Sequence, residues 1–186
     1  MLLSCFFVAV LTVLLGRETG VNFSKDRLYN NFFSALFHDL PEAVTRDIIS
    51  PVKQATDELP QIVKNIEDQI VQKELVPLME DFFKDEVLYF TNNEFANRVI
   101  VKGKVKEVSW EDLNNNYSDK NRPVDGKLVR LSDHLSAFLE ADSSIRHGIT
   151  SAHLEGGRSN MLKHYSDEKM INGIDAGALF RILAER

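Results

Sequence analysis

Apolar residues recur at helical spacing along most of this chain, and this periodicity limits the fold more than any other feature of the sequence. Ser24 is a suitable N-cap for a helix over residues 25–39. Pro41 suits the first position of a short helix that follows, because proline has no backbone N–H to lose there. A further amphipathic helix follows Leu59 and Pro60. The chain is therefore predicted to be mainly helical.

Residues 91–127 break this helical pattern. Thr91 and Glu94 have the spacing of a capping box, and "VIVKGKVKEV" alternates around Gly103 in the manner of a small hairpin. The stretch "LNNNYSDKNRPVDGK" reads as a polar, turn-rich loop. Helices resume beyond it, and the last has Ser166 as its N-cap. We predict an all-α bundle of several helices with a loop and hairpin insertion near residues 91–127.

The opening run "MLLSCFFVAVLTVLLG" favours a buried first helix of the domain. The alternative is a secretory signal or an anchor. The run lacks a positively charged start and a small-residue cleavage site. It is also shorter than the roughly 20 apolar residues that cross a bilayer. We therefore expect no membrane partner.

Charge and cysteine content narrow the classes of partner and compartment. The formal net charge of -6 argues against a DNA or RNA polymer, because proteins that bind such polymers gather Lys and Arg against the phosphates. A small anionic ligand stays compatible with this charge where positive side chains gather locally. The single cysteine, Cys5, excludes an internal disulfide framework and favours a reducing, cytoplasmic environment.

The stretch "FFSALFHDLPEAVTRDIISPVK" places a carboxylate on an apolar face. On a helix over residues 25–39, Asp39 shares a stripe with Phe32 and Ala35, so its side chain would face the core. A buried carboxylate has to be paired, protonated or coordinated. Asp39 could cap the next helix while His38 forms a hydrogen bond in the core, or the two side chains could hold a metal ion.

The same stretch carries a resemblance to a known family. "ALFHDLPEAVTRDIISPVK" resembles the signature of the HD superfamily of metal-dependent phosphohydrolases and is most similar to the branch of bacterial 5′-deoxynucleotidases. In that branch a Glu follows the His-Asp pair by three positions, an Asp follows by five more, and a Pro-Val-Lys comes next. This chain has Glu42, Asp47 and Lys53 in those places.

A second stretch, "KLVRLSDHLSAFLEA", resembles the late family helix that carries the final metal-ligand aspartate. Asp133 occupies that position. Periodicity alone would make Asp133 a solvent-facing acid, because the leucines of the helix lie on the opposite side. Small residues near Asp133 suit a helix that is buried on two faces.

The resemblance implies that the chain is an enzyme that hydrolyses a small phosphomonoester, a deoxynucleoside or nucleoside 5′-monophosphate. The cofactor implied is a divalent ion: Mn, Co, Mg, Fe or Zn. A homo-oligomer is implied as well. The implied site comprises the metal ligands His38, Asp39 and Asp133, the catalytic carboxylates Glu42 and Asp47, and the substrate-binding Lys53.

One family position is not filled. The family has an earlier metal-ligand histidine, whereas the first histidine of this chain is His38. "LLSCFFVAV" resembles the helix that carries the earlier ligand, with Ser4 or Cys5 at its place. We expect residues 1–186 to be a single HD-like domain that lacks an N-terminal portion. The alternative is a non-catalytic module with an incomplete metal site.

Overall fold

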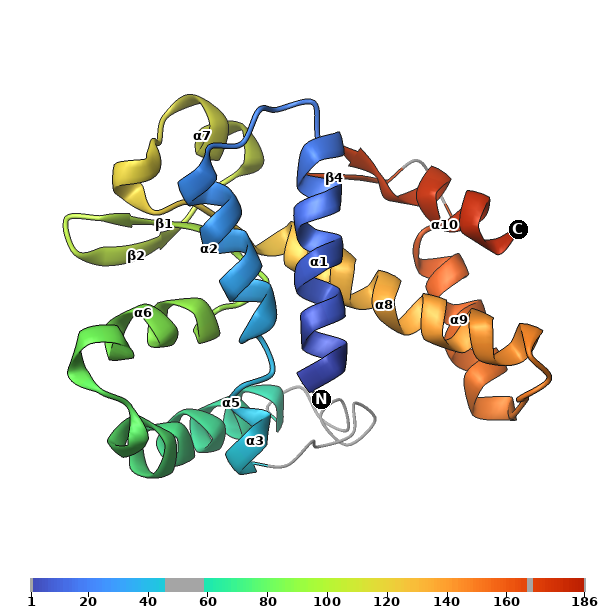
Figure 1. Ribbon diagram of the computed structural model, residues 1–186, viewed down its shortest axis with the longest axis horizontal. Helices are drawn as coiled ribbons and strands as arrows, with labels where there is room; N and C mark the ends of the chain where they lie inside the picture. Colours follow the sequence, from blue (N-terminus) through green and yellow to red (C-terminus); the bar gives the residue numbers. More distant parts are fainter. Residues whose placement is uncertain (1, 46–58, 167–168, 186) are drawn as a thin grey trace. The chain divides into compact units, whose positions relative to one another are not determined.

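The chain forms two compact units in the computed structural model, which describes residues 2–45, 59–166 and 169–185 (Figure 1). The small unit spans residues 37–92. The large unit combines residues 2–36 with residues 93–186.

Helices dominate both units, which confirms the predicted fold class and adds short antiparallel strands to it. The small unit contains α3 (Glu42–Thr45), α5 (Leu59–Ile70), a π-helical turn (Val71–Leu75), a 3-10 turn (Val76–Leu78) and α6 (Asp81–Thr91). The large unit contains α1 (Leu2–Glu18), α2 (Lys25–Leu36), β1 (Asn97–Val101), β2 (Lys104–Glu107), α7 (Trp110–Asn115), a 3-10 turn (Asp119–Asn121), β3 (Val124–Asp125), α8 (Gly126–Arg146), α9 (Ala152–His164), β4 (Met170–Ile171), β5 (Ile174–Asp175) and α10 (Ala176–Ala184).

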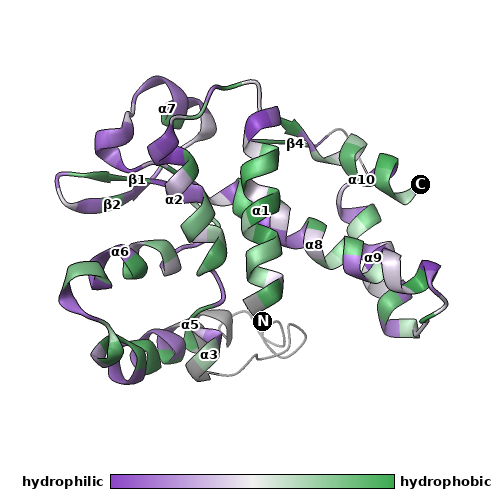
Figure 2. Cartoon of the chain, viewed as in Figure 1, coloured by the Kyte–Doolittle hydropathy of each residue, from purple (hydrophilic) through white to green (hydrophobic). Residues whose placement is uncertain are grey.

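The first helix is part of the core of the large unit, as predicted. Figure 2 shows α1 as hydrophobic along most of its length. Val8 and Ala9 are fully buried in one cluster with Ala35 of α2 and Val129 of α8. None of the helices in the described ranges is long and apolar enough to cross a membrane.

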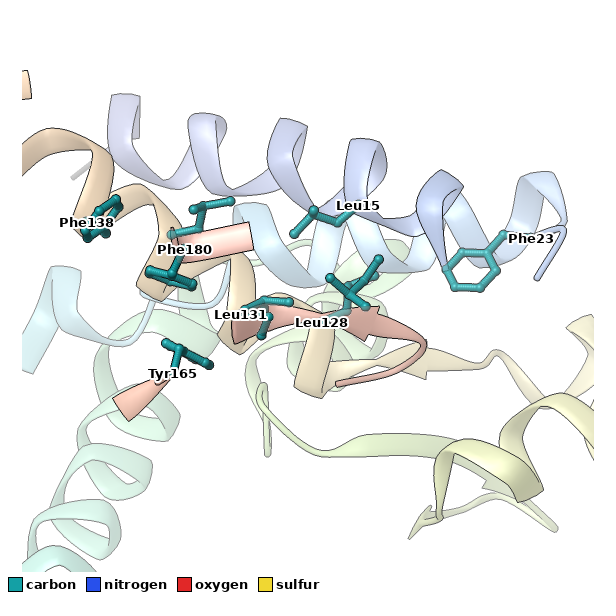
Figure 3. Close-up of a cluster of buried hydrophobic side chains, with 10 residues drawn as sticks. Leu15, Phe23, Leu128, Leu131, Phe138, Tyr165 and Phe180 are labelled. Carbon is teal, nitrogen blue, oxygen red and sulfur yellow. The ribbon is translucent and has the colours of Figure 1, made fainter. Parts of the chain in front are cut away.

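A larger apolar cluster surrounds α8, and Figure 3 shows its side chains. Leu128 and Leu131 of α8 are fully buried there. Tyr165, which follows α9, stacks on Phe180 of α10 with ring centroids 4.3 Å apart. Burial of such large aromatic surfaces joins the C-terminal helices to α8.

The hairpin predicted around Gly103 is confirmed. Strands β1 and β2 are antiparallel, with Val101 opposite Lys104. The two turn residues, Lys102 and Gly103, have φ of 51° and 74°, which is typical of a tight two-residue hairpin turn. Strand β3 pairs with the other edge of β1.

The capping box predicted at Thr91 and Glu94 is wrong. Thr91 is the last residue of α6, and the chain then turns and enters β1 at Asn97. Asn93 has φ of 51°, a left-handed conformation that interrupts a helix.

The helix start predicted at Ser166 is also wrong. A second hairpin, β4–β5, stands in its place, with Asn172 and Gly173 both at positive φ in the turn. α10 begins only at Ala176, where the Asp175 side chain accepts a hydrogen bond from the N–H of Ala178. Asn-Gly is the sequence most typical of a two-residue hairpin turn, and it overrides the helical spacing of its apolar neighbours.

A buried network of polar side chains joins α2, β3 and the β4–β5 hairpin. Asp125 is fully buried and accepts two hydrogen bonds from Arg27, at 2.7 and 2.8 Å. Asn31 donates to the same carboxylate at 2.7 Å. Asn172 donates to it at 3.3 Å and exchanges a pair of 2.9 Å hydrogen bonds with Asn97. The buried charge of Asp125 is thus compensated, and the hairpin is held in place.

Candidate metal centre

The His38–Asp39 pair lies in a turn rather than on a helix. Ser24 caps α2 as predicted, since its hydroxyl accepts a hydrogen bond from the N–H of Arg27. α2 ends at Leu36, however, and the chain turns through residues 37–41. Pro41 has no N–H to donate to the carbonyl oxygen of Phe37, and in a continuing helix its ring would clash with that carbonyl, so the helix does not extend through residues 37–41. The prediction that Asp39 lies on a buried helical stripe is therefore wrong. The Asp39 side chain is 32% exposed to solvent.

The turn brings the two side chains together. Nε2 of His38 lies 3.1 Å from Oδ1 of Asp39, and the His38 side chain is almost fully buried. Metal–ligand bonds of about 2.0–2.3 Å place neighbouring donor atoms about 3 Å apart around one ion. The pair therefore fits two adjacent ligand positions of a divalent ion, with a neutral imidazole and a carboxylate as donors.

Glu42 begins the short helix α3 directly after this turn. Its backbone N–H donates to the carbonyl oxygen of Asp39 at 3.0 Å, so the two acidic residues belong to one hydrogen-bonded turn. The Glu42 side chain is half-buried. The two other residues predicted from this stretch, Asp47 and Lys53, lie outside the described residues.

Asp133 lies on α8 in the large unit. The leucine face of α8 is buried, and so are Val129, Ser132 and Ser136 on its second face. Asp133 follows Val129 by one helical turn and is half-buried, so it is not the solvent-facing acid that periodicity alone indicates. His38 and Asp39 belong to the small unit, and their convergence with Asp133 stays a prediction.

At the start of the chain, Cys5 and Ser4 differ in exposure. Cys5 is 4% exposed, one turn before the buried Val8 of α1, whereas Ser4 is exposed. Of the two residues near the place of the missing histidine, Cys5 is the one whose side chain points inward. A thiolate is a ligand for soft or borderline divalent ions.

His134, which directly follows Asp133 on α8, was not predicted from the sequence as a functional residue. Its Nδ1 lies 2.8 Å from the hydroxyl of Tyr165. Burial lowers the pKa of His134 to about 4, with a further contribution from Arg130, so this imidazole is neutral at pH 7. Burial also raises the pKa of Tyr165 to about 12. Sequence alone gives no signal for this pair, because Tyr165 comes from another element.

Comparison with models of protein families matches residues 5–162 to the HD domain. The chain belongs to the HD domain family. The mostly helical fold described above is therefore an HD-domain fold, and HD domains are generally phosphohydrolases that bind divalent metal ions. No curated protein and no solved structure matches the chain.

Proposed function

We propose that this chain is a metal-dependent phosphohydrolase that releases phosphate from a deoxynucleoside or nucleoside 5′-monophosphate. The observation that carries the proposal is the His38–Asp39 pair of an HD domain, with donor atoms 3.1 Å apart and Glu42 on the same turn. The choice of a 5′-monophosphate rests on the similarity of residues 35–53 to the deoxynucleotidase signature.

His38, Asp39 and Asp133 are the proposed ligands of the divalent ion, which is Mn, Co, Mg, Fe or Zn. When bound, such an ion polarises a phosphoryl oxygen and lowers the pKa of a water molecule. Three acidic side chains, Asp39, Asp133 and Glu42, also need a cation to stay ionised together.

Glu42 is the proposed general base. Its carboxylate begins the helix that follows the ligand turn, where it can orient a water molecule and accept its proton. From the resemblance, Asp47 would contact the sugar or order the site, and Lys53 would neutralise charge on the phosphate.

The test is the release of inorganic phosphate from deoxyadenosine 5′-monophosphate, with Mn²⁺ or Co²⁺ added to the purified chain. Deoxyadenosine 3′-monophosphate is the control, since it has the same groups with the phosphate at another position. Metal-dependent release from the 5′ isomer supports the proposal. Equal release from both isomers would contradict the substrate, and no release from either would contradict the activity.

A second candidate function is a non-catalytic HD-fold module, which the lack of a histidine before His38 in the sequence favours. Cys5→His restores the family ligand type at this place, so it separates the two. If the chain binds metal weakly only because that ligand is missing, Cys5→His should raise metal affinity about 10- to 100-fold. A folded variant that still binds no metal would favour the non-catalytic function.

A further inference from the structure

The large unit contains a cavity of about 580 Å³ that the proposed metal centre does not use. Its volume lies within the range of about 300–1,000 Å³ that is usual for small-molecule sites. Residues of α7, α8, the end of α9 and the β4–β5 hairpin line it. Asp133, the ligand candidate on α8, is not among the lining residues.

The lining is positively charged in an acidic chain. Of the described residues that line it, Lys127, Arg130 and Lys169 are cationic and Glu111 is acidic, although the formal net charge of the whole chain is -6. Positive charge gathered on the wall of a cavity raises the local concentration of anions. This is the local clustering of cations that a small anionic ligand requires.

Two of these cations are held in place by neighbouring rings. The guanidinium carbon of Arg130 lies 4.4 Å from the centre of the Phe95 ring. Nζ of Lys169 donates to Nε2 of His164 at 3.1 Å and lies 5.2 Å from the centre of the Tyr165 ring. A cation fixed by such contacts loses less rotational freedom when it binds an anion.

The cavity also presents a rigid aromatic ring. Trp110 is half-buried and packs on Phe23 with ring centroids 6.2 Å apart. Its position is therefore set by the core of the large unit, to which Phe23 belongs (Figure 3). An aromatic side chain held in this way is a suitable surface on which a planar ring can stack.

The polar floor of the cavity is pre-formed. Asn172, which lines the cavity, is held by Asn97 and Asp125 through the buried network. Asp125 is in turn neutralised by Arg27, so its carboxylate does not cancel the positive charge of the lining. The cavity therefore combines fixed cations, a fixed aromatic ring and a fixed floor.

We propose that this cavity binds a small ligand that joins an aromatic ring to a phosphate group, of the size of a mononucleotide, without a metal ion. Arg130 and Lys169 contact the phosphate, and Trp110 stacks on the ring. The proposal does not depend on catalysis at His38 and Asp39, because the lining residues belong to the large unit alone.

Trp110 makes a direct test available, because it is the only tryptophan of the chain and it lines the cavity. The probe is adenosine 5′-monophosphate, titrated into the full chain with EDTA present so that metal-dependent hydrolysis is stopped. We expect a saturable change in tryptophan fluorescence. Adenosine, without the phosphate, and inorganic phosphate, without the ring, should each bind at least about ten-fold more weakly.

Matched variants localise the binding. Arg130→Gln and Lys169→Gln should each weaken it about ten-fold, since each removes a charged phosphate contact. Lys102→Gln, the same charge change in the exposed β1–β2 turn, should bind as the parent does. Asp39→Asn should also bind as the parent does, which separates this cavity from the metal centre. Circular dichroism checks that each variant folds.

Several results would overturn the proposal. They are a fluorescence that stays constant up to millimolar probe, equal binding of adenosine and its monophosphate, and unchanged binding by a folded Arg130→Gln or Lys169→Gln. Loss of binding in Asp39→Asn would also overturn it, by assigning the nucleotide to the metal centre. If one cavity variant does not fold, the other and the comparison of the three probes still decide.

Discussion

A Cβ atom added at Gly173 would stand 2.3 Å from the backbone carbonyl oxygen of Thr19, at the end of α1. Gly173 also has φ of 82°. The β4–β5 hairpin therefore approaches the start of the chain as closely as only glycine allows.

Gly173→Ala should be more destabilising than Gly103→Ala. Both glycines are the second residue of a two-residue hairpin turn at positive φ, but a Cβ at Gly103 meets nothing within 4 Å. We expect Gly103→Ala to cost about 1–2 kcal/mol from backbone strain alone. Gly173→Ala adds the contact with Thr19, a further 1–3 kcal/mol or so. Urea unfolding followed by Trp110 fluorescence measures both, and equal losses would contradict the close approach.

Asp142 should make the stability of the large unit depend on pH. Burial raises the pKa of this carboxyl, but hydrogen bonds from Nε of Arg158 at 2.6 Å and Nε of Arg146 at 2.5 Å outweigh burial and lower it. Because the pKa of Asp142 is lower in the folded chain than its unfolded value of about 3.9, the ionised carboxylate stabilises the fold at pH values above 3.9. This stability is lost as the pH falls through the pKa of the folded state.

Asp142→Asn should therefore cost about 1.5 kcal/mol at pH 7, a low value because both arginines stay partly exposed. The difference from the parent should shrink as the pH falls below about 4. Glu140→Gln, an exposed acid on the same helix, is the control and should change little at either pH. A difference for Asp142→Asn that stays constant between pH 7 and pH 3 would contradict the linkage.

Much of the fold follows from the sequence because it depends on local signals. Ser24 caps α2, and the Gly103 hairpin lies where alternation places it. The β4–β5 hairpin was missed because apolar residues around Asn172 and Gly173 also fit a helical stripe. There the turn preference of two residues outweighs the periodicity of a dozen.

Some residues of the candidate site could be predicted from the sequence, and the surroundings of others could not. His38, Asp39 and Glu42 are close in sequence, so a motif finds them, although the motif does not show that α2 ends at Leu36, before His38. Burial around Asp133 depends on how α1 and α8 pack, which periodicity within α8 does not reveal.

The clustering of cations around the cavity could not be predicted from the sequence either. Lys127 and Arg130 are one turn apart on α8, but Lys169 lies far along the chain, directly before β4. Only the packed fold brings these charges to one wall.

Glu42→Gln should abolish turnover and leave metal binding nearly intact. The change keeps the size of the side chain and removes its basicity, and general base catalysis contributes about 10²- to 10⁴-fold in rate. Phosphate release and metal titration on the same preparation measure the two effects. Metal affinity that falls in parallel with the rate would make Glu42 a ligand rather than a base.

Asp39→Asn should weaken metal binding itself. An amide is a poorer ligand than a carboxylate, so turnover should fall at limiting metal and recover in part at high metal concentration. The measurement is the rate as a function of Mn²⁺ concentration for parent and variant. Curves that overlay at every concentration would leave Asp39 as a residue of the turn only.

Calorimetric titration of the metal-free chain with Mn²⁺ measures whether His38, Asp39 and Asp133 hold one divalent ion. We expect one site per chain, weakened in both Asp39→Asn and Asp133→Asn and unchanged in Glu140→Gln on the exposed side of α8. Binding by Asp133→Asn that equals the parent, or a folded parent that takes up no ion, would show that these three residues do not form a metal site.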